Sequence, residues 1–357
     1  MQTTARKSSA ERTDFILETL LLNAENSGAT ETVAEVLKNG GLAAIPTETV
    51  YGLAANAFDP VACANIFKAK GRPGDNPLIV HICNMDMLKD VVEEVPEKAK
   101  ILAEKFWPGP LTMIMKKSDK IPMVTSANLP TVAVRFPAHH VAQRIIAEAE
   151  LPLAAPSANL SGSPSPTTFE HCVHDLLGRV DAIIDGGPCA VGVESTIISF
   201  AEETPMLLRP GYVTLEQLRG AIGEVGLSKA VLEKLGDGEK VLSPGMKYKH
   251  YAPKAKVSLV KGSREQYVKY VNEHADEHGV FALCFDEEAP VLKTSTVCYG
   301  SEYSDAEQAE RLFDALRELD ELGALRVYAH SPRTTGVGMA VYNRLVRAAG
   351  FDIITLD

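Results

Sequence analysis

Hydrophobic positions along the chain follow two alternating periods, one typical of amphipathic helices and one of short buried strands. In ETVAEVLKN, at 31–39, apolar residues at 33, 34, 36 and 37 predict a helix, and two glycines follow as a stop signal. Further helices are predicted at 61–70, 138–149, 168–177 and 214–222, and strands at 42–46, 78–82, 111–115, 132–136, 152–155, 182–185, 196–199 and 206–209. Many short strands at irregular spacing predict an α/β domain built on a mixed, twisted sheet.

The pattern weakens between about 223 and 256, where glycines and prolines interrupt any element that begins. This stretch is longer than the ~12–15 residues of ordinary loops. It contains the aromatic and basic run SPGMKYKHYAP at 243–253. These features favour a lid over a simple connection.

A second alternating series follows this linker. Strands are predicted at 257–260, 280–285 and 326–330, and helices at 263–278, 305–322 and 337–349. Such a βαβαβ series is typical of a small parallel sheet. The predicted organisation is an N-terminal extension (1–27) with one edge strand near 14–19, a first domain (28–222), a linker or lid (223–256) and a second domain (257–357).

Composition and charge narrow the class of protein. Hydrophobic residues make up 45% and charged residues 23%, as in an average soluble globular protein. The net charge of −11 argues against a broad basic face for nucleic acid, so any anion site must be local. The six cysteines form no C-x-x-C pair, and we expect free thiols in a reducing compartment. With no signal peptide in 1–14 and no run of ~18 apolar residues, we expect a cytoplasmic protein without a membrane partner.

The first candidate for chemistry is the end of the helix predicted at 61–70. Lys68 and Lys70 lie in its last turn, where cations can simply complement the negative end of the helix dipole. That interpretation is favoured for Lys68. Lys70 and Arg72 instead run into the irregular loop GRPGDNP at 71–77, where a guanidinium group can bind phosphate oxygens.

A second candidate is the loop AAPSANLSGSPSPT at 154–167, which follows a predicted buried strand. An ordinary turn also uses serine and asparagine, because they bond to their own backbone. Here, however, the hydroxyl and amide groups exceed what one turn requires: Ser157, Asn159, Ser161, Ser163 and Ser165. Such groups at a strand end are a common way for an α/β sheet to hold a nucleotide.

A third group consists of polar residues beside or within apolar runs. The segment PTETVYGLAANAFD at 46–59 begins with polar residues, and a polar strand edge is an equal alternative to a binding role. Arg135 lies within a predicted strand and requires a partner, because an unpaired buried charge costs several kcal/mol. That partner is either an internal acid or a substrate carboxylate. His81, taken alone, is more typical of a satisfied core histidine.

Several common signatures are absent from the sequence. The chain has no G-x-x-x-x-G-K-[ST], no G-x-G-x-x-G opening a helix and no G-x-S-x-G elbow. It also has no paired Cys and His spacing for a metal. We therefore expect chemistry that depends on positioning and charge, without a side-chain nucleophile.

Together these blocks resemble the YrdC-like family. KGR at 70–72 with SAN at 157–159 matches its K-x-R...S-x-N signature, over a resemblance that covers roughly residues 30–215. Other similar blocks are PTETVYGL at 46–53, NPLIVH at 76–81, WPGPLT at 107–112 and VESTI at 193–197. The linker run and the extra C-terminal domain are similar to the long form found in L-threonylcarbamoyladenylate synthases.

The resemblance implies an open, twisted α/β sheet with a basic concave pocket, followed by a Rossmann-like parallel domain that we expect to steady the lid. It implies a nucleotidyltransferase that joins L-threonine, bicarbonate and ATP into L-threonylcarbamoyl-AMP and pyrophosphate, with Mg²⁺ carried by the ATP phosphates and not by protein side chains. A downstream transferase complex would pass the threonylcarbamoyl group to tRNA. Stable nucleic-acid binding by this chain is not expected.

The resemblance also assigns residues by motif position. The chemical step would use Lys70, Arg72, Ser157 and Asn159. L-threonine would be held by Thr49, His81, Arg135, Ala155 and Ser195. ATP would be held by Arg72, Asn76, Thr131, Ser157, Ser165, Arg209 and, from the lid, Tyr251.

Two rival functions are weighed against this one. A double-stranded RNA binding module would use a basic concave surface, but the net charge of −11 counts against it. A carbamoyltransferase of the hydrogenase-maturation type also contains a YrdC-like domain, but that class brings zinc-finger cysteine pairs that this sequence lacks.

Overall fold

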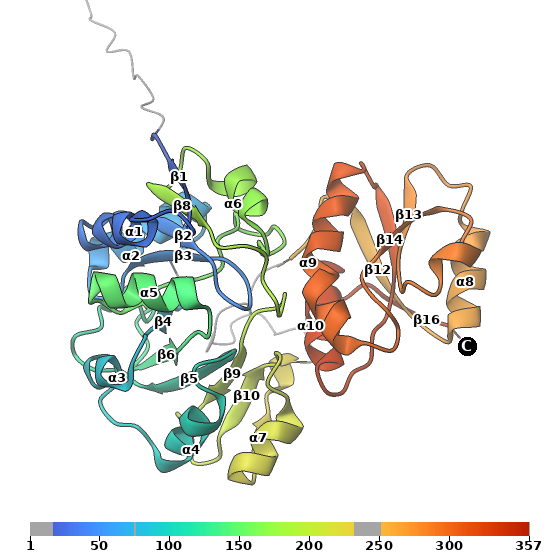
Figure 1. Cartoon of the computed structure of the whole chain (residues 1–357). Helices are drawn as coiled ribbons and strands as arrows, with labels where there is room; N and C mark the ends of the chain where they lie inside the picture. Colours follow the sequence, from blue (N-terminus) through green and yellow to red (C-terminus); the bar gives the residue numbers. More distant parts are fainter. Residues whose placement is uncertain (1–16, 75, 232–250, 357) are drawn as a thin grey trace, which may run out of the picture.

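A computed structural model describes residues 17–74, 76–231 and 251–356, which form two sheet-based units lying side by side (Figure 1). The first unit, residues 17–231, contains an eleven-stranded sheet in the order β1-β8-β2-β3-β7-β4-β6-β5-β9-β10-β11. Its strands are β1 (Leu20–Asn23), β2 (Ala43–Ile45), β3 (Gly52–Asn56), β4 (Ile79–His81), β5 (Leu111–Lys116), β6 (Thr131–Arg135), β7 (Leu153–Ala154), β8 (Ala182–Asp185), β9 (Thr196–Ser199), β10 (Met206–Arg209) and β11 (Gly226–Leu227). Its helices are α1 (Ala29–Lys38), α2 (Pro60–Lys70), α3 (Met85–Val91), α4 (Glu97–Phe106), α5 (His140–Ala149), α6 (Phe169–Leu176), α7 (Leu215–Ile222) and the 3-10 turn η1 (Lys229–Val231).

The second unit, residues 251–356, contains a five-stranded sheet in the order β14-β13-β15-β12-β16, and all its pairings are parallel. Its elements are β12 (Lys256–Lys261), α8 (Arg264–Glu273), β13 (Val280–Cys284), η2 (Ala289–Val291), β14 (Ser295–Cys298), α9 (Asp305–Glu321), β15 (Arg326–His330), α10 (Gly338–Ala348) and β16 (Ile353–Thr355). The first sheet mixes parallel pairs such as β4/β6 with antiparallel pairs such as β5/β6. The predicted fold class is confirmed in both units.

Some elements differ from the sequence prediction. An edge strand lies at Leu20–Asn23, directly after the expected range 14–19, of which 14–16 lie outside the described residues, and it pairs with β8. Strand β3 was not predicted, because GLAAN contains small residues and no β-branched ones. Helices α3 and α4 and strands β14 and β16 were also missed, since their charged or short sequences hide the apolar period. The boundaries at 27, 222 and 256 stay a prediction, and residues 232–250 of the predicted lid lie outside the described part.

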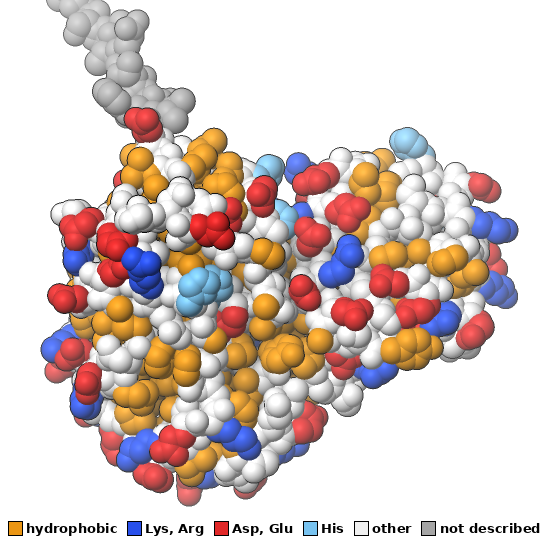
Figure 2. Space-filling model, in the orientation of Figure 1, with side chains coloured by type: hydrophobic (Ala, Val, Ile, Leu, Met, Phe, Trp, Pro, Cys, Tyr) orange, Lys and Arg blue, Asp and Glu red, His pale blue; other side chains and the backbone are white. Residues whose placement is uncertain are grey.

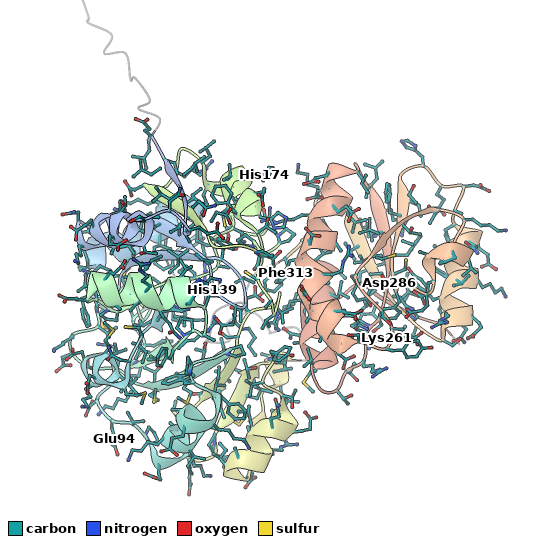
Figure 3. All side chains as sticks on the ribbon, in the orientation of Figure 1. Glu94, His139, His174, Lys261, Asp286 and Phe313 are labelled. Atoms are coloured by element: carbon teal, nitrogen blue, oxygen red, sulfur yellow. The ribbon has the colours of Figure 1, made fainter. Side chains whose placement is uncertain are left out.

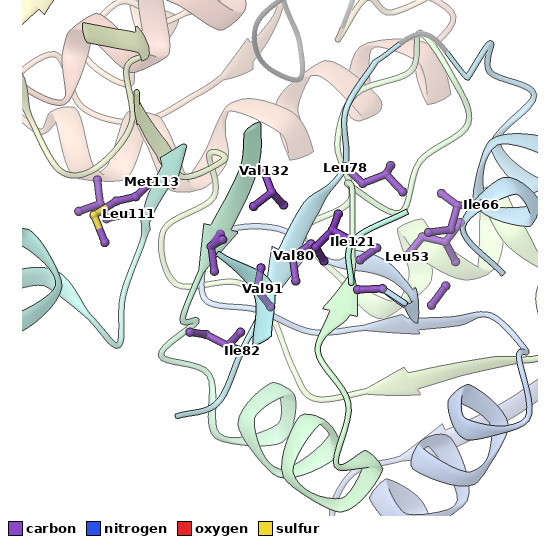
Figure 4. Packing of buried hydrophobic residues seen from close by; sticks show 14 of the residues in the cluster. Leu53, Ile66, Leu78, Val80, Ile82, Val91, Leu111, Met113, Ile121 and Val132 are labelled. Carbon is purple, nitrogen blue, oxygen red and sulfur yellow. The ribbon is translucent and has the colours of Figure 1, made fainter. Parts of the chain in front are cut away.

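Alternation along the strands separates the sheet of the first unit into two faces. On one face, Val80, Met113 and Val132 pack into the largest apolar cluster together with Ile66 of α2 (Figure 4). On the other face, their strand neighbours Ile79, Ile114 and Ala133 form a smaller apolar cluster. Because successive side chains point to opposite faces, His81 and Arg135 share this second face.

Helix α2 is fixed at both ends by local sequence, as predicted. The Asp59 side chain accepts hydrogen bonds from the backbone N–H groups of Val61 at 2.8 Å and Ala62 at 3.2 Å. At the other end, Gly71 takes a left-handed conformation with φ 61°, which glycine adopts without strain. The helix therefore ends at Lys70, immediately before the GRPGDNP loop.

The two units share an apolar cluster. Tyr251 and Phe313 of the second unit pack in one cluster with Val50 and Val193 of the first. Helices α9 and α10 are the elements of the second unit that face the first (Figure 1). In the described residues, no helix combines the length and the apolar character that a membrane span requires. Acidic and basic side chains alternate over the face shown in Figure 2, without a broad basic area.

Candidate functional site

A hollow opens where several strands of the first sheet end. It brings together residues from every candidate segment and from the start of the second unit. The predicted residues that line it are Thr49, Lys70, Arg72, His81, Arg135, Ala155, Ser157, Asn159, Ser195, Arg209 and Tyr251.

The sheet register explains why residues so far apart in sequence meet here. Strands β4 and β6 are parallel neighbours, and His81 pairs in register with Arg135 at their carboxyl ends. Arg209 is the last residue of β10, and Ser195 directly precedes β9, which pairs with β10. Thr112, at the start of β5, pairs in register with Arg135. One edge of the sheet thus presents two arginines, a histidine and two hydroxyl groups.

Arg135 has an internal acid as its partner, which decides one of the alternatives that the sequence left open. Its Nη2 lies 2.7 Å from Oε1 of Glu48, and its Nη1 donates to Oγ1 of Thr49 at 2.8 Å. Burial alone would raise the pKa of Glu48, but the charge of Arg135 outweighs it and holds that pKa below its usual value. A substrate carboxylate would therefore bind to a guanidinium that is already oriented.

His81 is held as a neutral imidazole. Burial, with a smaller contribution from the charge of Arg135, lowers the pKa of His81 to about 3. Its Nδ1 lies 3.2 Å from the carbonyl oxygen of Ile79. His81 can therefore hydrogen-bond a polar substrate group without adding a charge.

Lys70 joins the two halves of the K-x-R...S-x-N signature. Its Nζ donates to the main-chain oxygen of Ser157 and, at 2.6 Å, to that of Asn159. The Ser157 hydroxyl donates to Oδ1 of Asn159 at 2.6 Å, which closes the arrangement. Burial, and then the neighbouring Arg72, lower the pKa of Lys70 to about 7. An anion bound next to this lysine would restore its charge at neutral pH.

A further group surrounds Ser195 and Arg209. Arg209 donates from Nε to the main-chain oxygen of Ser195 at 3.0 Å and from Nη2 to its hydroxyl at 3.1 Å. The same hydroxyl lies 2.7 Å from Oγ1 of Thr112. Burial lowers the pKa of Arg209 to about 10, so it remains a cation at neutral pH. Lys70, Arg72, Arg135 and Arg209 together make a local cationic hollow in an acidic chain.

Three predicted residues do not line this hollow. Ser165 lies just behind it and donates to Glu194 at 2.5 Å. Asn76 is buried, and its side-chain amide has no hydrogen-bond partner among the described residues. Thr131 lies four residues before Arg135 on the same face of β6, about 13 Å along the strand. It lines a second hollow with residues of β5, β9 and β10, among them Ile114, Ser199 and Leu208.

Two acids were not among the predicted site residues. Glu48 orients Arg135, and Glu194 lines the hollow and accepts from Ser165. For Glu194 the signal in the sequence was limited to its place shortly before the predicted strand 196–199, since an acid that is buried must find a cationic partner. For Glu48, a position among polar neighbours gave no comparable signal.

Among the described residues of the predicted lid, Tyr251 lines the hollow, and its ring centroid lies 5.2 Å from that of Phe313. Its neighbours at 247–250 lie outside the described residues. Within the described ranges, no group of three or more His, Cys, Asp or Glu side chains is arranged to hold a metal ion.

These features define an α/β enzyme domain whose pocket suits a small anionic substrate beside a polar one. Two family models match the chain: "Telomere recombination" over residues 35–211 and "Threonylcarbamoyl-AMP synthase, C-terminal domain" over residues 213–350. The threonylcarbamoyl-AMP synthase of Pyrococcus abyssi is 45% identical over 330 residues, covering 90% of this chain and 94% of that protein. That of Bacillus subtilis is 46% identical over 324 residues, covering 90% and 93%.

A solved structure agrees with these relatives. The crystal structure of the Pyrococcus abyssi protein complexed with L-threonine has a TM-score of 0.88 to this chain, at 41% identity, and covers 95% of this chain and 100% of its own. The chain therefore belongs to the threonylcarbamoyl-AMP synthase family and is an enzyme, as the sequence resemblance indicated.

Proposed function

We propose that this chain joins L-threonine, bicarbonate and ATP into L-threonylcarbamoyl-AMP and pyrophosphate in the hollow described above. The observation that carries the proposal is the meeting of Lys70, Arg72 and Arg209 with the oriented guanidinium of Arg135 around one cavity. Three cations suit a triphosphate, and the fourth suits an amino-acid carboxylate.

L-threonine would bind at the Arg135 end of the hollow. Its carboxylate would meet Arg135, which Glu48 and Thr49 already orient. The neutral imidazole of His81 and the hydroxyl of Ser195 would bond the polar groups of the amino acid, with the backbone at Ala155 beside them.

ATP would lie along the same face of the sheet. Lys70, Arg72 and Arg209 would bind the phosphates, together with Ser157, Asn159 and the loop that ends at Ser165. The unpartnered amide of Asn76 and the hydroxyl of Thr131 lie at the amino ends of β4 and β6 and would hold the nucleoside. Between these two ends the face is apolar, with Ile79, Ala133 and Ile197, which suits a flat base.

The reaction would proceed in two steps. The threonine amine loses a proton and attacks the carbon of bicarbonate, or of CO₂ derived from it, to form a carbamate, with loss of water in the case of bicarbonate. A carbamate oxygen then attacks the α-phosphorus of ATP and expels pyrophosphate. Holding the reactants together can supply about 7–11 kcal/mol of the barrier, and fixed cations stabilise the charge that develops on the phosphates.

Exclusion of water would protect the labile carbamate. Tyr251 would close over the nucleotide as part of the lid. Mg²⁺ would be carried by the ATP phosphates and neutralise part of their charge. A separate transferase complex would move the threonylcarbamoyl group to tRNA, without stable binding of nucleic acid by this chain, and the location would be cytoplasmic.

Pyrophosphate release tests the proposal. The full chain with ATP, L-threonine and bicarbonate should release pyrophosphate, and omission of any one substrate should reduce release to the background rate. The variant Glu94→Gln, altered at an exposed residue away from the hollow, serves as a control that should match the unaltered chain. Release that continues at the full rate without threonine would show that the assignment is wrong.

A further inference from the structure

Two buried arginines of the second unit reach into the first unit behind the nucleotide loop, defined here as residues 157–165. Arg317 comes from α9 and Arg344 from α10. Both helices face the first unit, and Phe313 on α9 lies between the two units in Figure 3. Arg317 is 8% exposed and Arg344 is fully buried, so each must be paired within the interface. Neither lines the hollow.

Arg317 ties down the nucleotide loop at two points. Its Nη1 and Nη2 meet the two carboxylate oxygens of Asp175 at 3.2 and 2.8 Å, a bidentate pair. Oδ2 of Asp175 also accepts from the backbone N–H of Leu160 at 3.2 Å. Nη2 of Arg317 donates in addition to the main-chain oxygen of Pro164 at 2.6 Å. The end of the loop, at Pro164, is thus bonded directly to the guanidinium of Arg317. The middle of the loop, at Leu160, is bonded to it through the Asp175 carboxylate.

Arg344 holds the other side of the site in the same way. Its Nε donates to Oε2 of Glu194 at 3.0 Å, and its Nη2 donates to the main-chain oxygen of Glu194 at 3.1 Å. Oε1 of the same carboxylate accepts from Ser165 of the nucleotide loop at 2.5 Å. Nη1 of Arg344 donates to the main-chain oxygen of Pro210, the residue after Arg209. One arginine therefore holds the backbone next to Ser195 and next to Arg209, and it is linked through the Glu194 carboxylate to the side chain of Ser165.

Stability alone is a weak reason for such pairs, because well-packed apolar residues often replace buried ion pairs without loss. What a forked guanidinium adds is fixed geometry, since each of its bonds has a set direction. Here the bonds end on the backbone and side chains that shape the nucleotide side of the hollow. Arg317 bonds to no residue of the threonine side, whereas Arg344 also bonds to the main-chain oxygen of Glu194, next to Ser195.

We propose that Arg317 and Arg344 are positioning residues for ATP. Through them the second unit holds the backbone and side chains of the nucleotide site in place from behind, in addition to any support it gives the lid. The inference rests on the proposed function, because it takes residues 157–165 as the ATP loop. It goes beyond that function by assigning a role to two residues that touch neither substrate. Loss of either arginine should weaken ATP use, and loss of Arg317, which has no bond next to Ser195, should leave threonine use nearly unchanged.

The test compares Arg317→Lys, Arg317→Gln and Arg344→Lys with the matched control Asp314→Asn. Asp314 lies one helical turn from Arg317 on α9 and pairs across the same interface with His171 at 3.4 Å, but among the described residues it makes no bond to the nucleotide loop. The KM for ATP should rise roughly tenfold in each arginine variant, the effect of losing one charge-assisted hydrogen bond. In the two Arg317 variants the KM for threonine should change less than about threefold, and Asp314→Asn should leave both KM values unchanged.

A second readout does not depend on activity. Hydrogen exchange of the peptide covering 157–165, measured without ATP, should accelerate in the two Arg317 variants and not in Asp314→Asn, since Asp175, the acceptor for the Leu160 N–H, is no longer held by Arg317. If Arg317→Gln does not fold, Arg317→Lys, which keeps the charge, and Asp175→Asn give the answer.

The outcomes separate the two proposals. An unaltered chain that uses no ATP would overturn the proposed function. An unaltered chain that uses ATP, with folded arginine variants whose ATP KM and loop exchange match the control, would overturn the positioning role. Equal losses for ATP and threonine in the Arg317 variants would likewise contradict it.

Discussion

The two units use the same kind of sheet edge in different ways. In the first, Arg135, His81 and Arg209 end their strands and line an open hollow. In the second, His330 also ends a strand, but its Nδ1 lies 2.6 Å from Oε1 of the fully buried Glu288. Polar groups at the carboxyl ends of strands therefore become a candidate binding site only where a hollow leaves room for a ligand.

The cluster in the second unit is closed by its own contacts. The ring of His330 stacks on Tyr267 with centroids 4.3 Å apart, and Oε2 of Glu288 accepts from the backbone N–H of Phe285 at 2.9 Å. A second ring, that of Phe285, lies 5.0 Å from the imidazole. These polar groups supply one another's hydrogen-bond partners. Their role is therefore to hold together the end of β15, the segment that follows β13 and helix α8.

The largest effect that follows from this contrast concerns Arg72. It is only half-buried, so the fold should tolerate Arg72→Met with little change in thermal midpoint. Loss of one fixed donor to the reacting phosphates should lower kcat/KM for ATP about 10²- to 10³-fold. The measurement is steady-state pyrophosphate release.

The matched variant is Arg264→Met. Arg264 follows the end of β12 in the second unit, and it pairs with Glu302 and Tyr303 instead of lining the hollow. It should retain the kinetics of the unaltered chain. Similar losses in both variants would contradict the contrast between the two edges.

A change in the cluster of His330 and Glu288 should have the opposite effect, lowering stability and leaving the kinetics unaltered. Glu288→Gln keeps the shape of the side chain but removes the acid next to His330, and it should destabilise the protein by about 2 kcal/mol, as expected for a damaged buried hydrogen-bond network. Urea unfolding measures the change. The kinetics of the fraction that remains folded should be unaltered, and a selective loss of activity in a stable variant would show that this edge takes part in function.

The sequence predicted the hollow better than it predicted what surrounds it. Lys70, Ser157 and Asn159 could be found because a helix end and a strand end converge on short, dense polar motifs. Glu48 and Glu194 could not be assigned, because their roles depend on which arginine lies opposite in space.

Some helices and strands were missed in the sequence prediction for a related reason. Strand β3, GLAAN, pairs with β2 and β7 on both sides and is buried by its neighbours, so it does not require the β-branched residues by which strands are usually recognised. The contacts of Arg317 and Arg344 join residues more than 130 positions apart. No local pattern records such a pairing, and only the fold reveals it.

The smallest predicted effect is a pH dependence that also distinguishes the two edges. Burial and the neighbouring Arg72 lower the pKa of Lys70 to about 7, so its ammonium form prevails below that pH and its neutral form above it. ATP should bind the ammonium form better. The KM for ATP should therefore rise by up to about tenfold per pH unit above neutrality, because the fraction of Lys70 in the ammonium form falls by up to that factor for each pH unit above its pKa.

The control is Lys70→Met. Its measured ATP binding should be weaker but should not weaken further as the pH rises, and the KM for threonine of the unaltered chain should not rise with pH in this way. ATP titrates near the same pH, but that change also reaches the variant, so the difference between the two profiles belongs to the lysine. Parallel profiles would mean that Lys70 stays charged across the range and that its three bonds to Ser157 and Asn159 outweigh its burial.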